Sequence, residues 1–248
     1  MKRSPLLVLF AAALVAAVGL AYATRAVWRP EPKLALVARA DAPGFRDLVI
    51  GPATAGAVPA TVGPGPETVV PATEDLCTAL FGDPDAPRIG TGDTIAVYFT
   101  DYRCPYCRVL GALLIERAER GEITLIVREW PILGPASQAA ARTALAAARQ
   151  GAFLPAYERL MGAAFVPTPA YVRDLATDLR IDPARVAADI GDPAMEAHLA
   201  RNVALAETLG FRGTPGLVVG RTVARRSVRE PVLDALIRAE DRLGPPPC

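Results

Sequence analysis

Two cysteines separated by two residues, Cys104-Pro105-Tyr106-Cys107, are the side chains in this sequence best suited to chemistry. They follow an apolar run at 95–99 that predicts a buried strand, and they precede a helical pattern that extends to about Arg120. A thiol at the start of a helix faces unpaired backbone N–H groups and the positive end of the helix dipole, which favour the thiolate. Because the thiolate is the nucleophile, the spacing predicts that Cys104 attacks and that Cys107, one turn further on and buried, resolves the resulting disulfide.

The same cysteine pair has other uses. It supplies half of a zinc or iron–sulfur site, or two soft ligands for Cu(I) in a copper-handling module. The residues left to complete such a site are Cys77, Cys248 and the single histidine, His198, which are scattered along the chain. A redox-inert binding domain is a third reading. Thiol chemistry is favoured over both, and it needs no metal and no cofactor.

A second signal is Thr214-Pro215, which comes directly before a short apolar run at 217–219. An ordinary turn proline at the start of an edge strand would explain it. Together with the cysteine pair, however, the sequence favours a cis-proline loop beside the cysteines. In that position the backbone of Thr214 is exposed to a substrate chain, which pairs with it as an extra strand.

The elements around these residues form a recognisable order. A second apolar run at 123–127 makes a strand–helix–strand unit with the strand at 95–99 and the helix after it. A long alanine-rich helical region follows, from about 135 to 210, and prolines divide it into segments. Two of these segments begin at Asp182-Pro183 and Asp192-Pro193, each a capping residue ahead of proline. A hairpin over about 217–224 and a terminal helix over 230–243 complete the pattern.

Four segments, residues 99–107, 129–134, the helical region and 212–215, resemble the DsbA family. The similarity is greatest to the branch that has Cys-Pro-Tyr-Cys and a threonine before the cis-proline, such as the copper-sensitivity suppressor proteins. The resemblance implies an α/β thioredoxin fold with an inserted helical domain, spanning about 74–245, with the insert at about 135–210.

The resemblance also implies roles for individual residues. Cys104 and Cys107 are the expected attacking and resolving cysteines, and Thr214, Pro215 and Tyr106 are expected to contact the substrate. Tyr106 stands where strong oxidases have histidine, and Thr214 stands where they have valine. Whether the protein chiefly makes, breaks or reshuffles disulfides therefore stays open.

The N-terminal residues predict export. Residues 1–23 comprise a short basic start, an apolar run at 6–23 and the small-residue site Ala21-Tyr22-Ala23, as in a cleaved signal peptide. The apolar run is also long enough to be a single inner-membrane anchor. Both alternatives place the remainder of the chain in the periplasm. A flexible Pro/Gly-rich tether is predicted for 24–73, with two apolar patches at 34–37 and 48–50 that can dock elsewhere.

Composition limits the partners. The 248-residue chain has 27 basic and 26 acidic side chains, a formal net charge of +1, so it lacks the positive surface of a nucleic-acid binder. The expected partners are exported proteins that contain cysteines and a membrane redox protein that resets the cysteine pair. Homo-oligomerisation is left open.

The remaining candidates have several readings each. Cys77 and Cys248 either form a second disulfide that ties the start of the domain to the C-terminus, or remain inert, or Cys248 links two chains. His198 is expected on a surface or half-buried helix face. Glu129 is expected as a solvated carboxylate at a strand end, with assistance to Cys107 as the alternative. Tyr102 either packs or joins Tyr106 in a rim for unfolded substrates.

Overall fold

The computed structural model describes residues 31–49, 73–163 and 165–246. Within these ranges a seven-stranded sheet has the order β1-β2-β7-β6-β4-β5-β3. The strands are β1 (Leu36–Ala38), β2 (Arg46–Leu48), β3 (Arg88–Ile89), β4 (Thr94–Thr100), β5 (Ile123–Glu129), β6 (Gly216–Val219) and β7 (Thr222–Ala224). The helices are α2 (Thr73–Phe81), α3 (Pro105–Glu119), α4 (Pro135–Ala148), α5 (Phe153–Gly162), α6 (Pro169–Asp178), α7 (Pro183–Ile190), α8 (Pro193–Thr208) and α9 (Glu230–Asp241).

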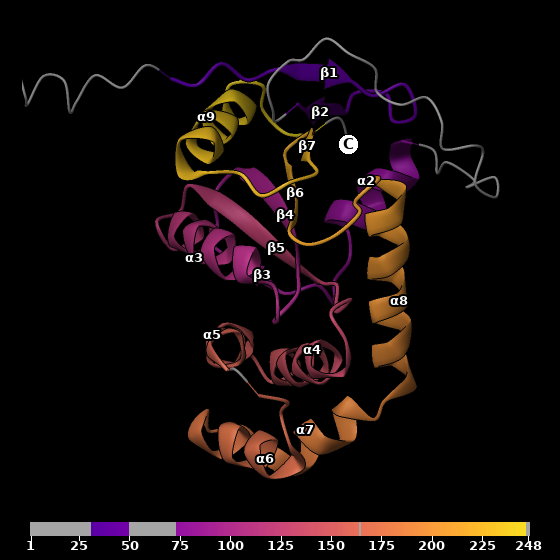
Figure 1. Cartoon of the computed structure of the whole chain (residues 1–248), viewed down its shortest axis with the longest axis vertical. Coiled ribbons are helices and arrows are strands. Elements are labelled where there is room, and N and C mark those ends of the chain that lie inside the picture. The colour runs from indigo at the N-terminus through magenta and orange to yellow at the C-terminus, as the bar shows by residue number, and fades with distance from the viewer. Residues whose placement is uncertain (1–30, 50–72, 164, 247–248) are drawn as a thin grey trace, which may run out of the picture. The chain divides into compact units, whose positions relative to one another are not determined.

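The centre of the sheet is the predicted strand–helix–strand unit. Strands β4 and β5 are parallel and joined by α3, whereas β6 is antiparallel to β4 and to β7. The alternation of side chains along β4 buries both faces of the sheet. Ala96 and Tyr98 pack with α3 and α9, and Val97 and Phe99 pack with α2 and the end of α8. Figure 1 shows these two helix pairs on opposite sides of the sheet.

The helical insert begins after β5 and returns to the sheet through α8, as the sequence predicts (Figure 1). Four of its five helices, α4, α6, α7 and α8, have proline at the first position. The carboxylates of Asp182 and Asp192 accept backbone N–H groups in the first turns of α7 and α8, as expected from the Asp-Pro pairs. Each cap of this kind contributes about 1 kcal/mol to helix stability. The predicted fold class, a thioredoxin fold with a helical insert, is confirmed.

Residues 34–49 differ from the predicted tether. They form the β1–β2 hairpin, and β2 joins the sheet by parallel pairing with β7. The Phe45 side chain is buried, and the guanidinium of Arg39 bonds to Asp41 and to the Leu209 carbonyl at the end of α8. These tertiary contacts stabilise strands that are too short to form alone. The compact unit therefore starts at Leu34, not at residue 74.

Several predictions fall on residues that the structure does not describe. The signal or anchor segment at 1–23, the tether residues 50–72 and Cys248 lie outside the described ranges. Among the described residues, no helix has the length and apolar character that crossing a membrane requires.

Candidate functional site

The two cysteines of the pair lie at the N-terminus of α3, as predicted, and neither is bonded to another cysteine. Cys104 is the N-cap residue, and its Sγ accepts the backbone N–H of Cys107 at 3.2 Å. Pro105 occupies the first helical position. Proline has no backbone N–H, and an N–H at this position would have no acceptor within the helix, so no hydrogen bond is lost. The sulfur of Cys104 is thus held beside the unpaired N–H groups that favour a thiolate.

Burial distinguishes the two thiols. Cys104 keeps 4% of its surface exposed, whereas Cys107 is 0% exposed. Burial, followed by a hydrogen bond with Cys104, raises the pKa of the Cys107 thiol to about 12, against the smaller opposing effects of a backbone hydrogen bond from Asp101 and a side-chain hydrogen bond with Thr214. Cys107 therefore strongly prefers its protonated form, and only Cys104 presents surface to a second molecule.

The loop before β6 completes the site. The Thr214–Pro215 peptide bond is cis, as predicted, and the Sγ of Cys104 donates to the Thr214 carbonyl at 3.4 Å. Thr214 thus contacts Cys104 through its backbone and Cys107 through its side chain. The structure brings Cys104, Cys107, Thr214 and Pro215 together from segments more than a hundred residues apart, since Cys104 and Thr214 are 110 positions apart in the chain.

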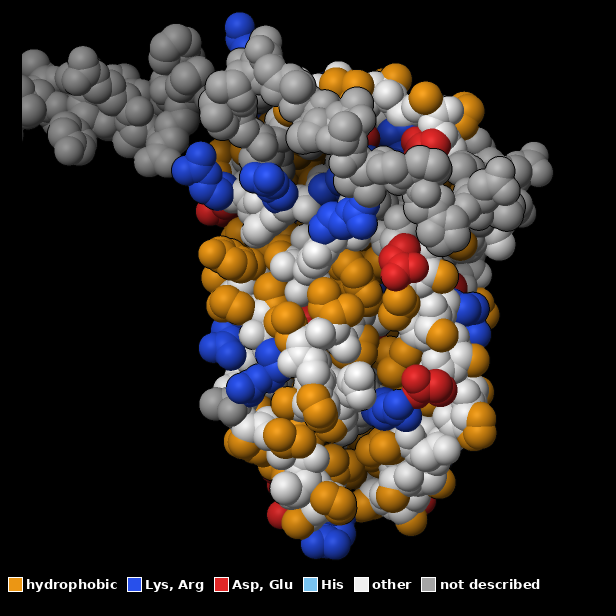
Figure 2. Space-filling view, turned by 45° about the vertical axis from the view of Figure 1, so that its right-hand side comes forward, with side chains coloured by type: hydrophobic (Ala, Val, Ile, Leu, Met, Phe, Trp, Pro, Cys, Tyr) orange, Lys and Arg blue, Asp and Glu red, His pale blue; other side chains and the backbone are white. Residues whose placement is uncertain are grey.

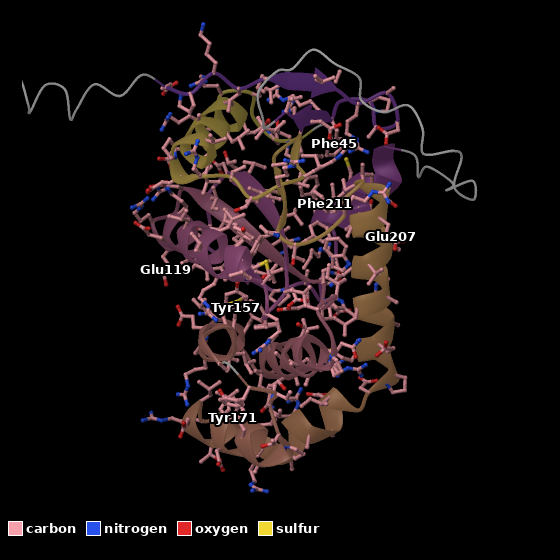
Figure 3. The ribbon with its side chains drawn as sticks, in the orientation of Figure 1. Phe45, Glu119, Tyr157, Tyr171, Glu207 and Phe211 are labelled. Atoms are coloured by element: carbon pink, nitrogen blue, oxygen red, sulfur yellow. The ribbon has the colours of Figure 1, made fainter. Side chains whose placement is uncertain are left out.

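Gly216, the first residue of β6, lets this loop approach the aromatic core. A methyl group there would lie 2.7 Å from ring carbons of Phe211, which packs against Phe99 with a centroid separation of 5.1 Å. Figure 3 labels Phe211 in the interior beside the sheet. We expect Gly216→Ala to lower the free energy of unfolding by about 1–3 kcal/mol, because the ring has no free space to enter.

Urea denaturation of the purified variant measures this cost. The matched control is Gly213→Ala in the same loop, because none of the described atoms lies within 4 Å of a methyl group at that position. Equal stability of the two variants would contradict the predicted clash.

Buried polar side chains lie behind the cysteines. Glu129 is fully buried at the end of β5, contrary to the expected solvated position, and its Oε1 accepts the Tyr102 hydroxyl at 2.6 Å. Burial raises the pKa of Glu129 to about 8, and the nearby Asp101 carboxylate adds to the rise. Tyr102 is buried as well, packing against Tyr157 of α5, which Figure 3 shows directed toward α3. Tyr102 therefore packs in the core and forms no part of an exposed rim.

An apolar surface surrounds the start of α3. Tyr106 is 66% exposed, and other exposed large apolar side chains are Val109 of α3, Ile132 and Leu133 after β5, and Phe165 and Val166 before α6. The Arg103 guanidinium bonds to the Ala163 carbonyl, so the segment before α6 lies next to the cysteine loop. Figure 2 shows that hydrophobic side chains cover much of the face it presents, with scattered charges.

The single histidine is not near the cysteines. His198 is buried on α8, contrary to the predicted surface or half-buried position, and burial lowers its pKa. It forms a cluster with Asp83 and Asp85, the one group among the described residues with metal-ligand spacing. The Asp83 carboxylate is already paired with the guanidinium of Arg128, and this pairing neutralises its charge. Neither Cys104 nor Cys107 belongs to this cluster.

The predicted second disulfide remains a prediction. Cys77 is buried in α2, and its expected partner, Cys248, lies outside the described residues.

Sequence reasoning missed one residue of the site. Asp101 follows β4 directly, is fully buried, and bonds to the cysteine loop and to the helical insert. The sequence did contain a signal for this role. Asp101 is an acidic residue between a buried strand and the cysteine pair, and a side chain in such a position is expected to be buried and hydrogen-bonded.

Comparison with protein families matches residues 94–237 to the DSBA-like thioredoxin domain. The matched range begins at β4 and ends within α9, so it contains the cysteine pair, the helical insert and the cis-proline loop. No match was found among curated protein sequences.

Solved structures give further similarity. A thioredoxin-like oxidoreductase from Silicibacter pomeroyi DSS-3 is 36% identical with a TM-score of 0.61, and the match covers 66% of this chain and 97% of that one. The catalytic domain of Proteus mirabilis ScsC is 27% identical with a TM-score of 0.58, covering 67% and 95%. A periplasmic thioredoxin-like protein from Salmonella enterica serovar Typhimurium is 29% identical with a TM-score of 0.59, covering 66% and 95%.

Proposed function

Because the chain belongs to the DSBA-like thioredoxin domain family, we propose that this oxidoreductase exchanges disulfides with other proteins through Cys104 and Cys107. The observation that carries the proposal is the position of the Cys104 sulfur. It caps α3, accepts the N–H of Cys107 at 3.2 Å and lies 3.4 Å from the Thr214 carbonyl. A helix N-terminus supports a reactive thiolate, and the adjoining loop offers backbone to a substrate strand.

The proposed reaction in the oxidising direction has two displacements. A substrate thiolate attacks the sulfur of Cys104 in the Cys104–Cys107 disulfide, and the bond to Cys107 breaks. The Cys107 thiolate takes up a proton, as its pKa of about 12 favours. A second substrate thiolate then attacks the substrate sulfur of the mixed disulfide, and Cys104 leaves as a thiolate. The substrate loses two electrons, which reside in the two thiols of the protein.

The reverse direction uses the same steps. The Cys104 thiolate attacks a substrate disulfide, and Cys107 displaces the substrate from Cys104 after losing its proton. Equilibrium with glutathione measures which direction prevails. A reduction potential near about −120 mV would assign the protein to disulfide formation, and one near about −270 mV would assign it to reduction.

The substrates we propose are exported proteins with cysteines. The basic and apolar pattern of residues 1–23 supports export to the periplasm, and the similar Salmonella protein is periplasmic. The exposed Tyr106 beside Cys104 and the backbone of Thr214 are the proposed substrate contacts. A membrane redox protein would restore the cysteine pair after each turnover.

The function is tested directly with oxidised protein and a reduced peptide that carries two cysteines. We expect one disulfide to pass to the peptide for each protein molecule, with two protein thiols appearing at the same rate. The separated products and a thiol titration measure both quantities. A protein that retains its Cys104–Cys107 disulfide in the presence of a reactive dithiol peptide would overturn the proposal.

A further inference from the structure

We propose that Asp101 is a positioning residue, which holds the cysteine loop against the helical insert so that Cys104 remains at the N-cap of α3. The proposal rests on the proposed function, since its effect is read on the thiol of Cys104. Asp101 follows the last residue of β4 and is fully buried. Its position between the strand and the cysteine pair gives it contacts in both directions.

The carboxylate of Asp101 accepts hydrogen bonds from three segments of the chain. Its Oδ1 accepts the backbone N–H of Arg103 at 2.7 Å and the hydroxyl of Ser137 at 2.6 Å, and its Oδ2 accepts the backbone N–H of Leu133 at 2.9 Å. Arg103 belongs to the cysteine loop, Leu133 follows β5, and Ser137 lies in the first turn of α4. One side chain therefore joins the loop to the insert.

The backbone of Asp101 contacts the cysteines themselves. Its carbonyl accepts the N–H of Cys104 at 3.1 Å, and its N–H forms a hydrogen bond with Cys107. Fixing the Asp101 side chain therefore fixes two main-chain groups that orient the pair. Release of the carboxylate would let the loop from 101 to 104 turn, and the Cys104 sulfur would lose its place beside the N–H of Cys107.

A carboxylate fits this position better than its neutral analogue. All three partners of the side chain are donors, and a buried donor without an acceptor is unfavourable. An asparagine keeps one acceptor oxygen but presents an NH₂ group to the donors on the other side. Asp101→Asn thus loses the acceptor on one side of the carboxylate while keeping the volume of the side chain.

The test is the alkylation rate of Cys104 by iodoacetamide at pH 7, together with the reduction potential, in the reduced full-length protein. We expect Asp101→Asn to slow alkylation about tenfold and to make the couple less oxidising, because the thiolate loses backbone donors. Ser137→Ala removes only the contact with the insert and should shift both quantities in the same direction by less, about threefold in rate.

The sign of the effect distinguishes positioning from charge. If Asp101 acted through its negative charge, Asp101→Asn would speed alkylation and make the couple more oxidising, since a nearby anion disfavours the thiolate. That outcome would overturn the proposal. An unchanged rate and potential in Ser137→Ala would also overturn it, and this variant serves the test even if Asp101→Asn does not fold.

A matched control separates positioning from general loss of stability. Asp83→Asn alters another largely buried aspartate, which lies between α2 and β3. Asp83 pairs with Arg128 of β5 and belongs to the cluster with His198, away from the cysteines. We expect it to lower stability with no change in alkylation rate or potential. Equal changes in Asp83→Asn and Asp101→Asn would mean that destabilisation alone explains both. Failure of the proposed function itself appears separately, as wild-type protein that does not exchange disulfides.

Discussion

Cys104→Ser is expected to reduce disulfide exchange to the rate seen in buffer alone, whereas Cys107→Ser is expected to accumulate covalent complexes with substrates. The reason is the division of roles that burial produces. Cys104, at the helix N-terminus, keeps 4% of its surface exposed, whereas Cys107 has no exposed surface and a pKa of about 12. Without the first thiol there is no nucleophile, and without the second no protein thiol resolves the mixed disulfide.

Non-reducing gel electrophoresis measures the complexes, and exchange with a disulfide-containing peptide measures the activity. Covalent complexes in Cys107→Ser should disappear on addition of dithiothreitol. The double variant Cys104→Ser, Cys107→Ser is the control, because it retains the fold and the cysteines outside the pair but has neither active thiol. Full activity in Cys104→Ser would exclude the mechanism, and so would complexes of equal amount in the double variant.

The elements next to the cysteines could be predicted because their signals are local. The apolar run at 95–99 lies inside β4, and the proline at the first position of α3 fixes the start of that helix. The hairpin across Gly220 was also predicted, because glycine favours a turn between two short apolar runs. In the structure Gly220 has a positive φ and separates β6 from β7. In each case a few consecutive residues determine the element.

Elements that depend on distant contacts were missed. Strand β3 has two residues, which is too short for any periodic pattern. The β1–β2 hairpin lies in a Pro/Gly-rich stretch and is stabilised by contacts that Arg39 and Phe45 make with residues far away in sequence. The sequence of a strand that ends in Glu129 is the same whether the carboxyl group is solvated or buried. The burial of this carboxyl group depends on Tyr102 and on the helical insert, which lie outside the strand.

The burial of Glu129 has a large consequence for stability at alkaline pH. Glu129→Gln is expected to gain stability relative to wild type as the pH rises, by on the order of 4 kcal/mol between pH 4 and pH 9. The pKa of Glu129 is raised from 4.5 to about 8 in the folded protein. Between these values the unfolded chain has an ionised glutamate while the folded protein keeps it protonated, so folding takes up a proton.

The sign of this effect follows from the raised pKa. The contribution of the protonated carboxyl is fully present below about pH 4.5 and is lost as the pH rises through about 8. Glutamine does not titrate and still offers an oxygen to the Tyr102 hydroxyl, so its contribution stays constant across this range. Above pH 8 the wild type must either bury a charge or unfold, and the variant avoids that cost.

Urea denaturation at pH 5, 7 and 9 measures the difference, with Glu196→Gln as the control at an exposed carboxylate that forms an ion pair with Arg142 at the surface. That control should show a nearly constant difference from wild type, because exposed pairs contribute little. A difference between Glu129→Gln and wild type that does not change with pH would mean that Glu129 is ionised in the folded protein. The hydrogen bond with Tyr102 would then have to stabilise a buried anion beside the Asp101 carboxylate, where the two charges repel each other.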